Sequence, residues 1–189
     1  MPVESVQDGT AGMLRLLAGQ AAVAIEHAGL RARMETLTLT DELTGVATRR
    51  VFEDELPREL ARARRHEYPV SIAMLDLDRL GAFNVLRGER EGDRLIKEAA
   101  AGWRSQLREV DTLARLNGGT FAVVLPNCGL GEAIEVMDRV RAATPRAQTG
   151  SAGVARWDGE EPSELLQSRC AEALTTAKRA GRNMTIGAE

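Results

Sequence analysis

The sequence has few of the residue types that build disulfide scaffolds, nucleic-acid surfaces or membrane spans. Its two cysteines, Cys128 and Cys170, have neither metal-ligand spacing nor a pattern of pairs. Aromatic residues make up 3% of the chain and the net charge is −3, so we expect no nucleic-acid partner. No apolar run approaches the roughly 18 residues that span a bilayer, and the N-terminus does not resemble a signal peptide. We therefore expect no membrane contact and a cytoplasmic location.

The composition predicts a soluble chain with one sizeable hydrophobic core. Of the 189 residues, 43% are apolar and 28% are charged. A chain of this length and composition buries enough apolar surface for one main globular domain. Lys97 and Lys178 are the only lysines, so arginine supplies the other cationic side chains.

The N-terminal segment has the pattern of one long amphipathic helix. Its apolar residues recur every three or four positions: Leu14, Leu17, Ala21, Ile25, Ala28 and Met34. Only ten residues precede it, most of them not apolar, so we expect this apolar stripe to have no core of its own and to pair two chains in a homodimer. The stretch also resembles the last helix of a GAF sensor domain. We assign residues 1–40 to this linker and dimerisation helix, and residues 41–189 to the globular domain.

After Thr40 the pattern predicts an α/β (α+β) domain with the order helix, strand, helix, two strands, helix, strand, helix and a short apolar end. The run "PVSIAMLDLDRL" is a strand that ends on Asp76 and Asp78, whose i, i+2 spacing places both carboxylates on one face. Acids at a strand end attract cations. Farther along, "LARLNGGTFAVVLP" predicts two strands joined by a glycine turn.

Three motifs in fixed order resemble the GGDEF family of diguanylate cyclases, from about Asp41 to Gly187. They are "DELTGVATRR", "DLDRLGAFNVLRGEREGD" and "CAEALTTAKRAGRN". The resemblance implies a nucleotide-cyclase, palm-like fold: a five-stranded, mainly antiparallel sheet flanked by helices. It also implies a reaction that joins two GTP molecules into cyclic di-GMP with Mg²⁺. By the same resemblance, Asp41 and Arg115 match a structural ion pair.

The family's signature hairpin is altered in this chain. Its five positions are occupied by Asn117, Gly118, Gly119, Thr120 and Phe121. In the family, Mg²⁺ is held by the first strand aspartate, the next backbone carbonyl and a hairpin acid; Asp76 and Leu77 match the first two. The acid is missing, so the comparison predicts a weakened metal site and no catalytic set. Asp78 lies near Asp76 but on the wrong side of the ion to replace the missing acid.

The nucleotide-binding positions are better preserved than the signature. Four residues match family contacts to the guanine base or the triphosphate: Asn84, Asp93, Lys178 and Arg182. Four neighbouring positions depart from the family pattern and predict weakened GTP binding: Leu80, Gly81, Val85 and Thr175. The structural alternatives are a loop cap for Asn84, a helix N-cap for Asp93 and a solvated helix end for the two cations.

A second constellation matches the family's RxxD inhibitory site, where cyclic di-GMP binds in active members. Arg108 and Asp111 have the motif spacing, and Arg139 matches a further arginine of that site. An arginine fork and a carboxylate can read two edges of one guanine. The structural alternative is a surface ion pair at a helix end.

These observations predict a catalytically inactive GGDEF-like signalling domain that senses guanine nucleotides. Cyclic di-GMP at the RxxD site is the expected ligand, with GTP as a second ligand. Two alternatives stay open at this stage: a dimerisation or protein-interaction module without nucleotide, and an active diguanylate cyclase.

Overall fold

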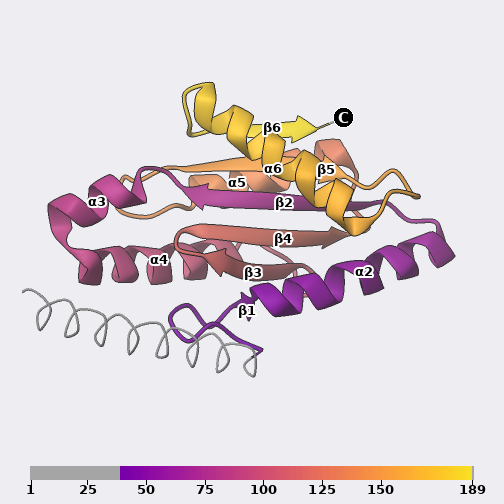
Figure 1. Cartoon of the computed structure of the whole chain (residues 1–189), viewed down its shortest axis with the longest axis horizontal. Helices are drawn as coiled ribbons and strands as arrows, with labels where there is room; N and C mark the ends of the chain where they lie inside the picture. The colour runs from indigo at the N-terminus through magenta and orange to yellow at the C-terminus, as the bar shows by residue number, and fades with distance from the viewer. Residues whose placement is uncertain (1–38, 189) are drawn as a thin grey trace, which may run out of the picture. The chain divides into compact units, whose positions relative to one another are not determined.

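Short apolar strands build one mixed sheet in the computed structural model, which describes residues 39–188 (Figure 1). The strands are β1 (Ala47–Thr48), β2 (Val70–Leu77), β3 (Thr112–Asn117), β4 (Thr120–Pro126), β5 (Gly150–Arg156) and β6 (Thr185–Ala188). They lie in the order β1-β3-β4-β2-β5-β6. The central pairs are antiparallel, whereas β1 runs parallel to β3 and β6 runs parallel to β5. This confirms the α+β class.

The sheet has six strands, so the predicted number of five is wrong. The edge strands β1 and β6 contain two and four residues, and four residues are the shortest run in which a period-2 pattern shows. The central antiparallel arrangement agrees with the expectation from the resemblance.

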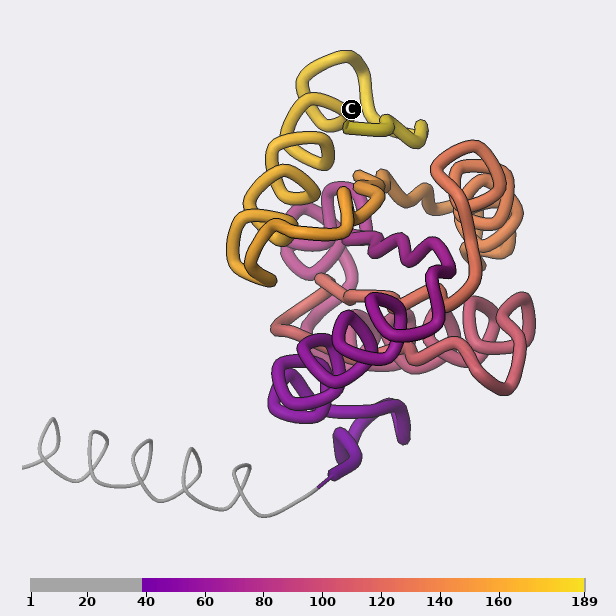
Figure 2. Tube along the Cα trace, turned by 90° about the vertical axis from the view of Figure 1, so that its right-hand side faces the viewer, coloured from indigo at the N-terminus to yellow at the C-terminus, as the bar shows by residue number. Residues whose placement is uncertain are grey.

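Helices cover both faces of this sheet. They are α2 (Arg49–His66), α3 (Leu80–Arg87), α4 (Glu89–Arg104), α5 (Leu130–Ala142) and α6 (Ser163–Arg179). Figure 2 shows α2 and α6 on one side of the strands and α4 and α5 on the other. The short helix α3 was not predicted as a separate element. Gly88, with a φ of 87°, separates it from α4.

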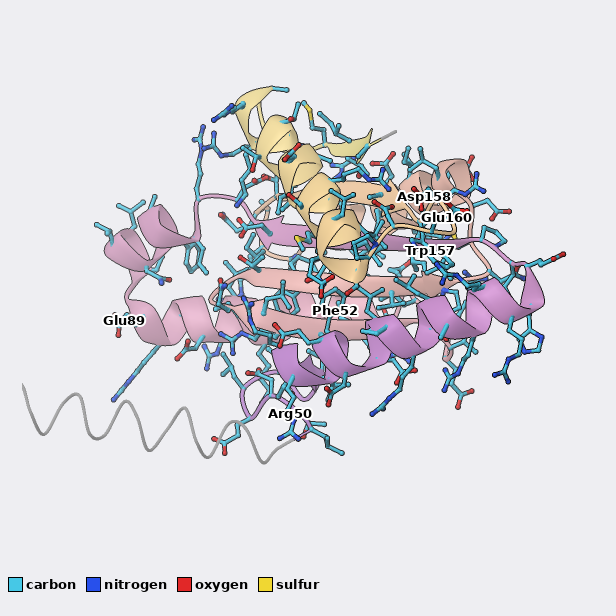
Figure 3. The ribbon with its side chains drawn as sticks, turned by 45° about the vertical axis from the view of Figure 1, so that its right-hand side comes forward. Arg50, Phe52, Glu89, Trp157, Asp158 and Glu160 are labelled. Atoms are coloured by element: carbon cyan, nitrogen blue, oxygen red, sulfur yellow. The ribbon has the colours of Figure 1, made fainter. Side chains whose placement is uncertain are left out.

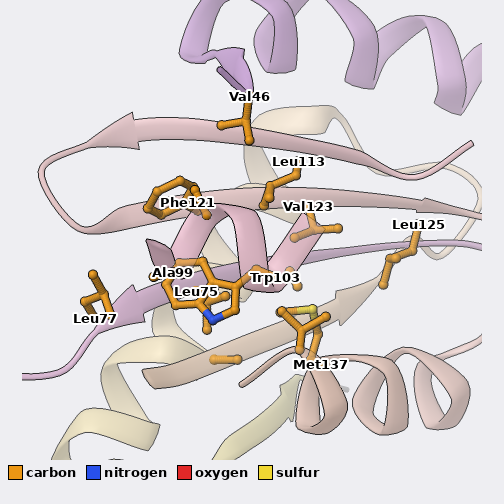
Figure 4. Close-up of a cluster of buried hydrophobic side chains, with 14 of the residues drawn as sticks. Val46, Leu75, Leu77, Ala99, Trp103, Leu113, Phe121, Val123, Leu125 and Met137 are labelled. Carbon is orange, nitrogen blue, oxygen red and sulfur yellow. The ribbon is translucent and has the colours of Figure 1, made fainter. Parts of the chain in front are cut away.

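A large apolar cluster lies between the sheet and α4 and α5. Trp103 of α4 and Phe121 of β4 are its largest aromatic members, with ring centroids 5.0 Å apart in an edge-to-face arrangement (Figure 4). The Trp103 Nε1–H donates to Thr144 Oγ1 at 3.1 Å, which satisfies the polar atom of this buried ring.

The opposite face of the sheet packs against α2 and α6. Phe52 points from α2 toward the strands, whereas Arg50 lies on the outer side of the same helix (Figure 3). At Gly153 of β5 the backbone of α6 approaches so closely that a Cβ would lie 2.2 Å from Leu174 N and 2.4 Å from Cys170 O. Both cysteines are buried as free thiols, and burial raises the pKa of Cys170 to about 12.

The β3–β4 hairpin turns at Gly118 and Gly119, as predicted. Asn117 and Thr120 face each other across the turn, and Gly118 has a φ of 41°, which favours glycine. No helix within residues 39–188 is both long and apolar enough to cross a bilayer. The expected N-terminal dimerisation helix and its GAF-like character fall in residues 1–38, outside the described residues.

Candidate functional site

Three polar side chains form a row across the ends of the central strands. Asp76 of β2 pairs with Thr120 of β4 on one side and with Ser151 of β5 on the other. Directly paired residues on neighbouring strands share a face of the sheet. The register therefore brings the family-type aspartate beside a threonine of the altered signature.

Both carboxylate oxygens of Asp76 already have partners. The Thr120 hydroxyl donates to Asp76 Oδ2 at 2.6 Å, and Lys178 Nζ lies 2.7 Å from Asp76 Oδ1. Lys178 reaches the strand from the last turn of α6, which crosses this face of the sheet. An aspartate expected to hold a metal ion is thus held by a hydroxyl and an ammonium group.

Asp78, the second acid of the strand end, is buried and fully committed to the fold. It accepts hydrogen bonds from Thr149 Oγ1 at 2.7 Å, Ser151 Oγ at 2.7 Å and the backbone N–H of Asn183 at 3.1 Å. These bonds fasten the chain after α6 to the sheet.

A side chain at the position that matches the family's hairpin acid would require neighbouring leucine side chains to shift. A Cβ on the buried Gly119 would lie 2.9 Å from Leu80 Cδ2 and 3.1 Å from Leu77 Cβ. Among the described residues there is no group of three or more His, Cys, Asp or Glu side chains suited to a metal ion. GGDEF-type catalysis uses Mg²⁺, which prefers carboxylate, phosphate and water oxygens. Asp76 and the Leu77 carbonyl supply one carboxylate and one carbonyl oxygen, which is one carboxylate fewer than the family's metal site.

The guanine-reading positions lie together and are uncommitted. Asn84 in α3 packs against Gly92 in α4, where a Cβ would lie 1.9 Å from Asn84 Oδ1. That oxygen is buried and has no hydrogen-bond partner. Asp93, the next residue, is exposed and forms no hydrogen bond or ion pair within residues 39–188. Since α4 begins at Glu89, Asp93 lies inside the helix, and the N-cap alternative is wrong.

Arg182 lies just beyond α6 and not on it, with a φ of 66°. It lines a shallow pocket of about 280 Å³ together with Arg79, which has a φ of 56°. Neither guanidinium has a hydrogen-bond or ion-pair partner among the described residues. Sequence analysis missed Arg79, because only the fold brings the start of α3 beside the chain that leaves α6.

The RxxD residues meet at the turn between α4 and β3. Asp111 Oδ2 accepts hydrogen bonds from the Arg108 backbone N–H at 2.8 Å and from Arg108 Nε at 3.4 Å. The Asp111 side chain is 1% exposed, and its Oδ1 is buried without a partner. Arg139 Nη2 donates to the Gln106 carbonyl at 3.1 Å, which places this arginine beside the same turn.

The ion pair between Asp41 and Arg115 is confirmed, with 3.0 Å between Arg115 Nη1 and Asp41 Oδ1. Burial by itself raises the pKa of Asp41, but hydrogen bonds from Thr44 and Arg115 outweigh it and lower the pKa below its usual value. This pair joins the loop before β1 to strand β3.

A sequence model of the family described as "Diguanylate cyclase, GGDEF domain" matches residues 38–184. The chain belongs to the GGDEF family. This GGDEF domain is 36% identical over 155 residues to diguanylate cyclase DgcP of Pseudomonas aeruginosa, and 30% identical over 164 residues to the response regulator PleD of Caulobacter vibrioides. These alignments cover 77% and 80% of the chain but only 23% and 36% of the two relatives.

Solved GGDEF structures have the same fold. The GGDEF domain of DgcB from Caulobacter crescentus, in complex with c-di-GMP, matches with a TM-score of 0.76 and 29% identity over 80% of this chain and 93% of that one. SiaD, in complex with its activator SiaC from Pseudomonas aeruginosa, matches with a TM-score of 0.76 and 30% identity over 97% of this chain and 76% of that one.

Proposed function

We propose that this GGDEF domain binds guanine nucleotides without converting GTP into cyclic di-GMP. The observation that carries the proposal is the state of Asp76, whose two oxygens accept from Thr120 and pair with Lys178. The reaction needs metal ions that activate the attacking ribose oxygen and neutralise the triphosphate. Loss of a metal-holding acid weakens transition-state stabilisation by several kcal/mol, and about 1.4 kcal/mol is a factor of ten in rate.

GTP binding is supported by the contrast between the metal-matching and the guanine-matching positions. Asp76 has a partner on each oxygen, but Asn84 Oδ1 and the Asp93 carboxylate are acceptors without partners among the described residues. Guanine presents N1–H and N2–H donors on its Watson–Crick edge. A guanine base would satisfy the buried acceptor that the fold leaves unpaired.

Cyclic di-GMP binding at Arg108, Asp111 and Arg139 is the second part of the proposal. The unpaired Asp111 Oδ1 can accept from a guanine edge, and the Arg108 side chain, 51% exposed, covers this carboxylate. The base reaches Asp111 once Arg108 swings away and donates to guanine O6 and N7 instead. Each bidentate contact discriminates bases by about 1 to 3 kcal/mol, so cyclic di-AMP is rejected.

Incubation with GTP and Mg²⁺ tests the absence of catalysis. We expect no cyclic di-GMP above background by liquid chromatography. Cyclase activity is the second candidate function, because a relative with 36% identity is named a diguanylate cyclase. Product formation that disappears in an Asp76→Asn variant would establish that candidate and refute the proposal.

Calorimetry with each nucleotide tests binding. We expect cyclic di-GMP to bind more tightly than GTP and cyclic di-AMP to give no heat. Arg108→Ala should remove most of the cyclic di-GMP affinity, while Arg65→Ala, an exposed arginine at the end of α2, should leave it unchanged. If folded protein gives no heat with any guanine nucleotide, nucleotide binding is excluded and the alternative is a dimerisation or protein-interaction module.

A further inference from the structure

We propose that Lys178 takes the place of a divalent cation beside Asp76, so that the domain binds the triphosphate of GTP without Mg²⁺. The inference rests on the proposed function, and it adds that GTP binding at the same site does not require a metal ion. It starts from the disagreement between the donor set present here and the Mg²⁺ site that the family uses.

The first step is that the protein offers a metal ion few oxygen ligands at Asp76. Mg²⁺ gives up its water reluctantly and binds through one or two carboxylates together with phosphate oxygens. At Asp76 it would have to share the carboxylate with the Lys178 ammonium group, 2.7 Å from Oδ1, whose positive charge repels a cation, and with the Thr120 hydroxyl, 2.6 Å from Oδ2. No second carboxylate is free at the strand end, because Asp78 is buried and accepts three hydrogen bonds.

The second step is that Lys178 can serve Asp76 and a phosphate at once. Its side chain is 35% exposed, whereas that of Asp76 is 17% exposed. An ammonium group carries three N–H donors, and the contact to Asp76 uses one of them. The lysine therefore neutralises the aspartate that would repel a triphosphate, and still offers donors to the phosphate oxygens.

The third step is the charge around the pocket beyond α6. Arg79 and Arg182 line it with guanidinium groups that have no partner among the described residues, and the Asp78 carboxylate there is held by hydrogen bonds. Two arginines without partners thus line the pocket, and the one carboxylate in its lining, Asp78, is held by hydrogen bonds. Guanidinium groups match phosphate oxygens in geometry and charge.

The test measures GTP affinity by calorimetry in Mg²⁺ and in EDTA on the full chain. We expect dissociation constants that agree within about threefold, whereas loss of a bound metal would change them by tenfold or more. Asp76→Asn should leave affinity unchanged or tighten it in both buffers. Lys178→Met should weaken it at least about tenfold and Lys178→Arg should retain it. Lys97→Met, at the only other lysine, is the matched control, and thermal melts verify folding.

Mn²⁺ titration without nucleotide, followed by electron paramagnetic resonance, gives an independent measurement. We expect no stoichiometric site; one that Asp76→Asn removes would overturn the inference. GTP binding that requires Mg²⁺ would also overturn it, while leaving nucleotide binding intact. If GTP gives no heat in either buffer, the GTP-binding part of the proposed function fails, and the Mn²⁺ titration alone decides whether the metal site is lost.

Discussion

At the scale of single residues, hydrogen bonding distinguishes Asp76 from Asn84. Each carboxylate oxygen of Asp76 already has one partner, whereas Asn84 Oδ1 is buried with no partner among the described residues. A buried acceptor without a partner costs about 1 to 3 kcal/mol. The fold carries this cost at the position that matches the family's guanine contact, which supports the proposal that the domain binds a guanine nucleotide.

Gly92 determines where the Asn84 carboxamide lies, because a Cβ there would be 1.9 Å from Asn84 Oδ1. We expect Gly92→Ala to push the carboxamide away and weaken GTP binding at least about tenfold, or about 1.4 kcal/mol. Gly81→Ala is the control, since a Cβ at Gly81 has no neighbour within 4 Å. Calorimetry measures the effect, and equal affinities of the two variants would show that Gly92 has no positioning role.

Restoring an acid at Gly119 should not restore cyclase activity. The Cβ of the new side chain would lie 2.9 Å from Leu80 Cδ2 and 3.1 Å from Leu77 Cβ, before its other atoms are placed. Overpacking of this kind costs about 1 to 3 kcal/mol of the free energy of unfolding. We expect Gly119→Glu to unfold at lower urea concentration and to make at most trace product from GTP. Full activity with unchanged stability would mean that the pocket opens readily and that only the acid was missing.

At the scale of elements, the sequence predicted most of the fold but not its edges. The long periodic helices and the central strands carry strong patterns, and the hairpin turn is encoded by Gly118 and Gly119. Strand β1 is too short to show alternation, β6 has only the minimum length of four residues, and α3 presents exposed apolar residues in place of a buried stripe. Likewise, motif positions predicted Lys178 near the phosphates, but only the crossing of α6 over β2 shows it paired with Asp76.

The contact between α6 and β5 depends on the absence of a side chain at Gly153. An alanine Cβ there would overlap Leu174 N at 2.2 Å and Cys170 O at 2.4 Å, and helix backbone cannot move aside locally. We expect Gly153→Ala to lower the free energy of unfolding by about 3 kcal/mol or more. Gly131→Ala in α5 has nothing within 4 Å and should raise it by up to about 1 kcal/mol. Urea unfolding compares both, and a mild effect at Gly153 would contradict this packing.

The stabilisation that the Asp41–Arg115 ion pair gives to the fold should depend on pH. The folded-state pKa of Asp41 is lowered, so its stabilisation is present above the unfolded pKa, about 3.9, and is lost as pH falls through the folded value. We expect Asp41→Asn to lower the free energy of unfolding by about 1 to 3 kcal/mol at pH 7 and to match the wild type in strong acid. Asp54→Asn, at an exposed ion pair, should change little. A difference that persists in acid would exclude the charge as its cause.

At the scale of the whole molecule, an apolar cluster covers each face of the described sheet. Among the described residues, these two clusters are built from residues between Leu43 and Ala188. We expect the domain to remain folded without residues 1–38. The predicted amphipathic stripe of the N-terminal segment remains to be buried elsewhere, and a second copy of the same helix is the simplest surface that could cover it.

Removing residues 1–38 should therefore separate association from folding. We expect the full chain to be a dimer by light scattering, and residues 39–189 to be a monomer with nearly the same cooperative thermal unfolding at equal concentration. Leu17→Glu, which places a charge in the stripe, should weaken the dimer in the full chain, because a buried unpaired carboxylate in a helix interface is strongly unfavourable. If the shortened chain stays dimeric, the contact lies on the folded domain and the N-terminal stripe has another use.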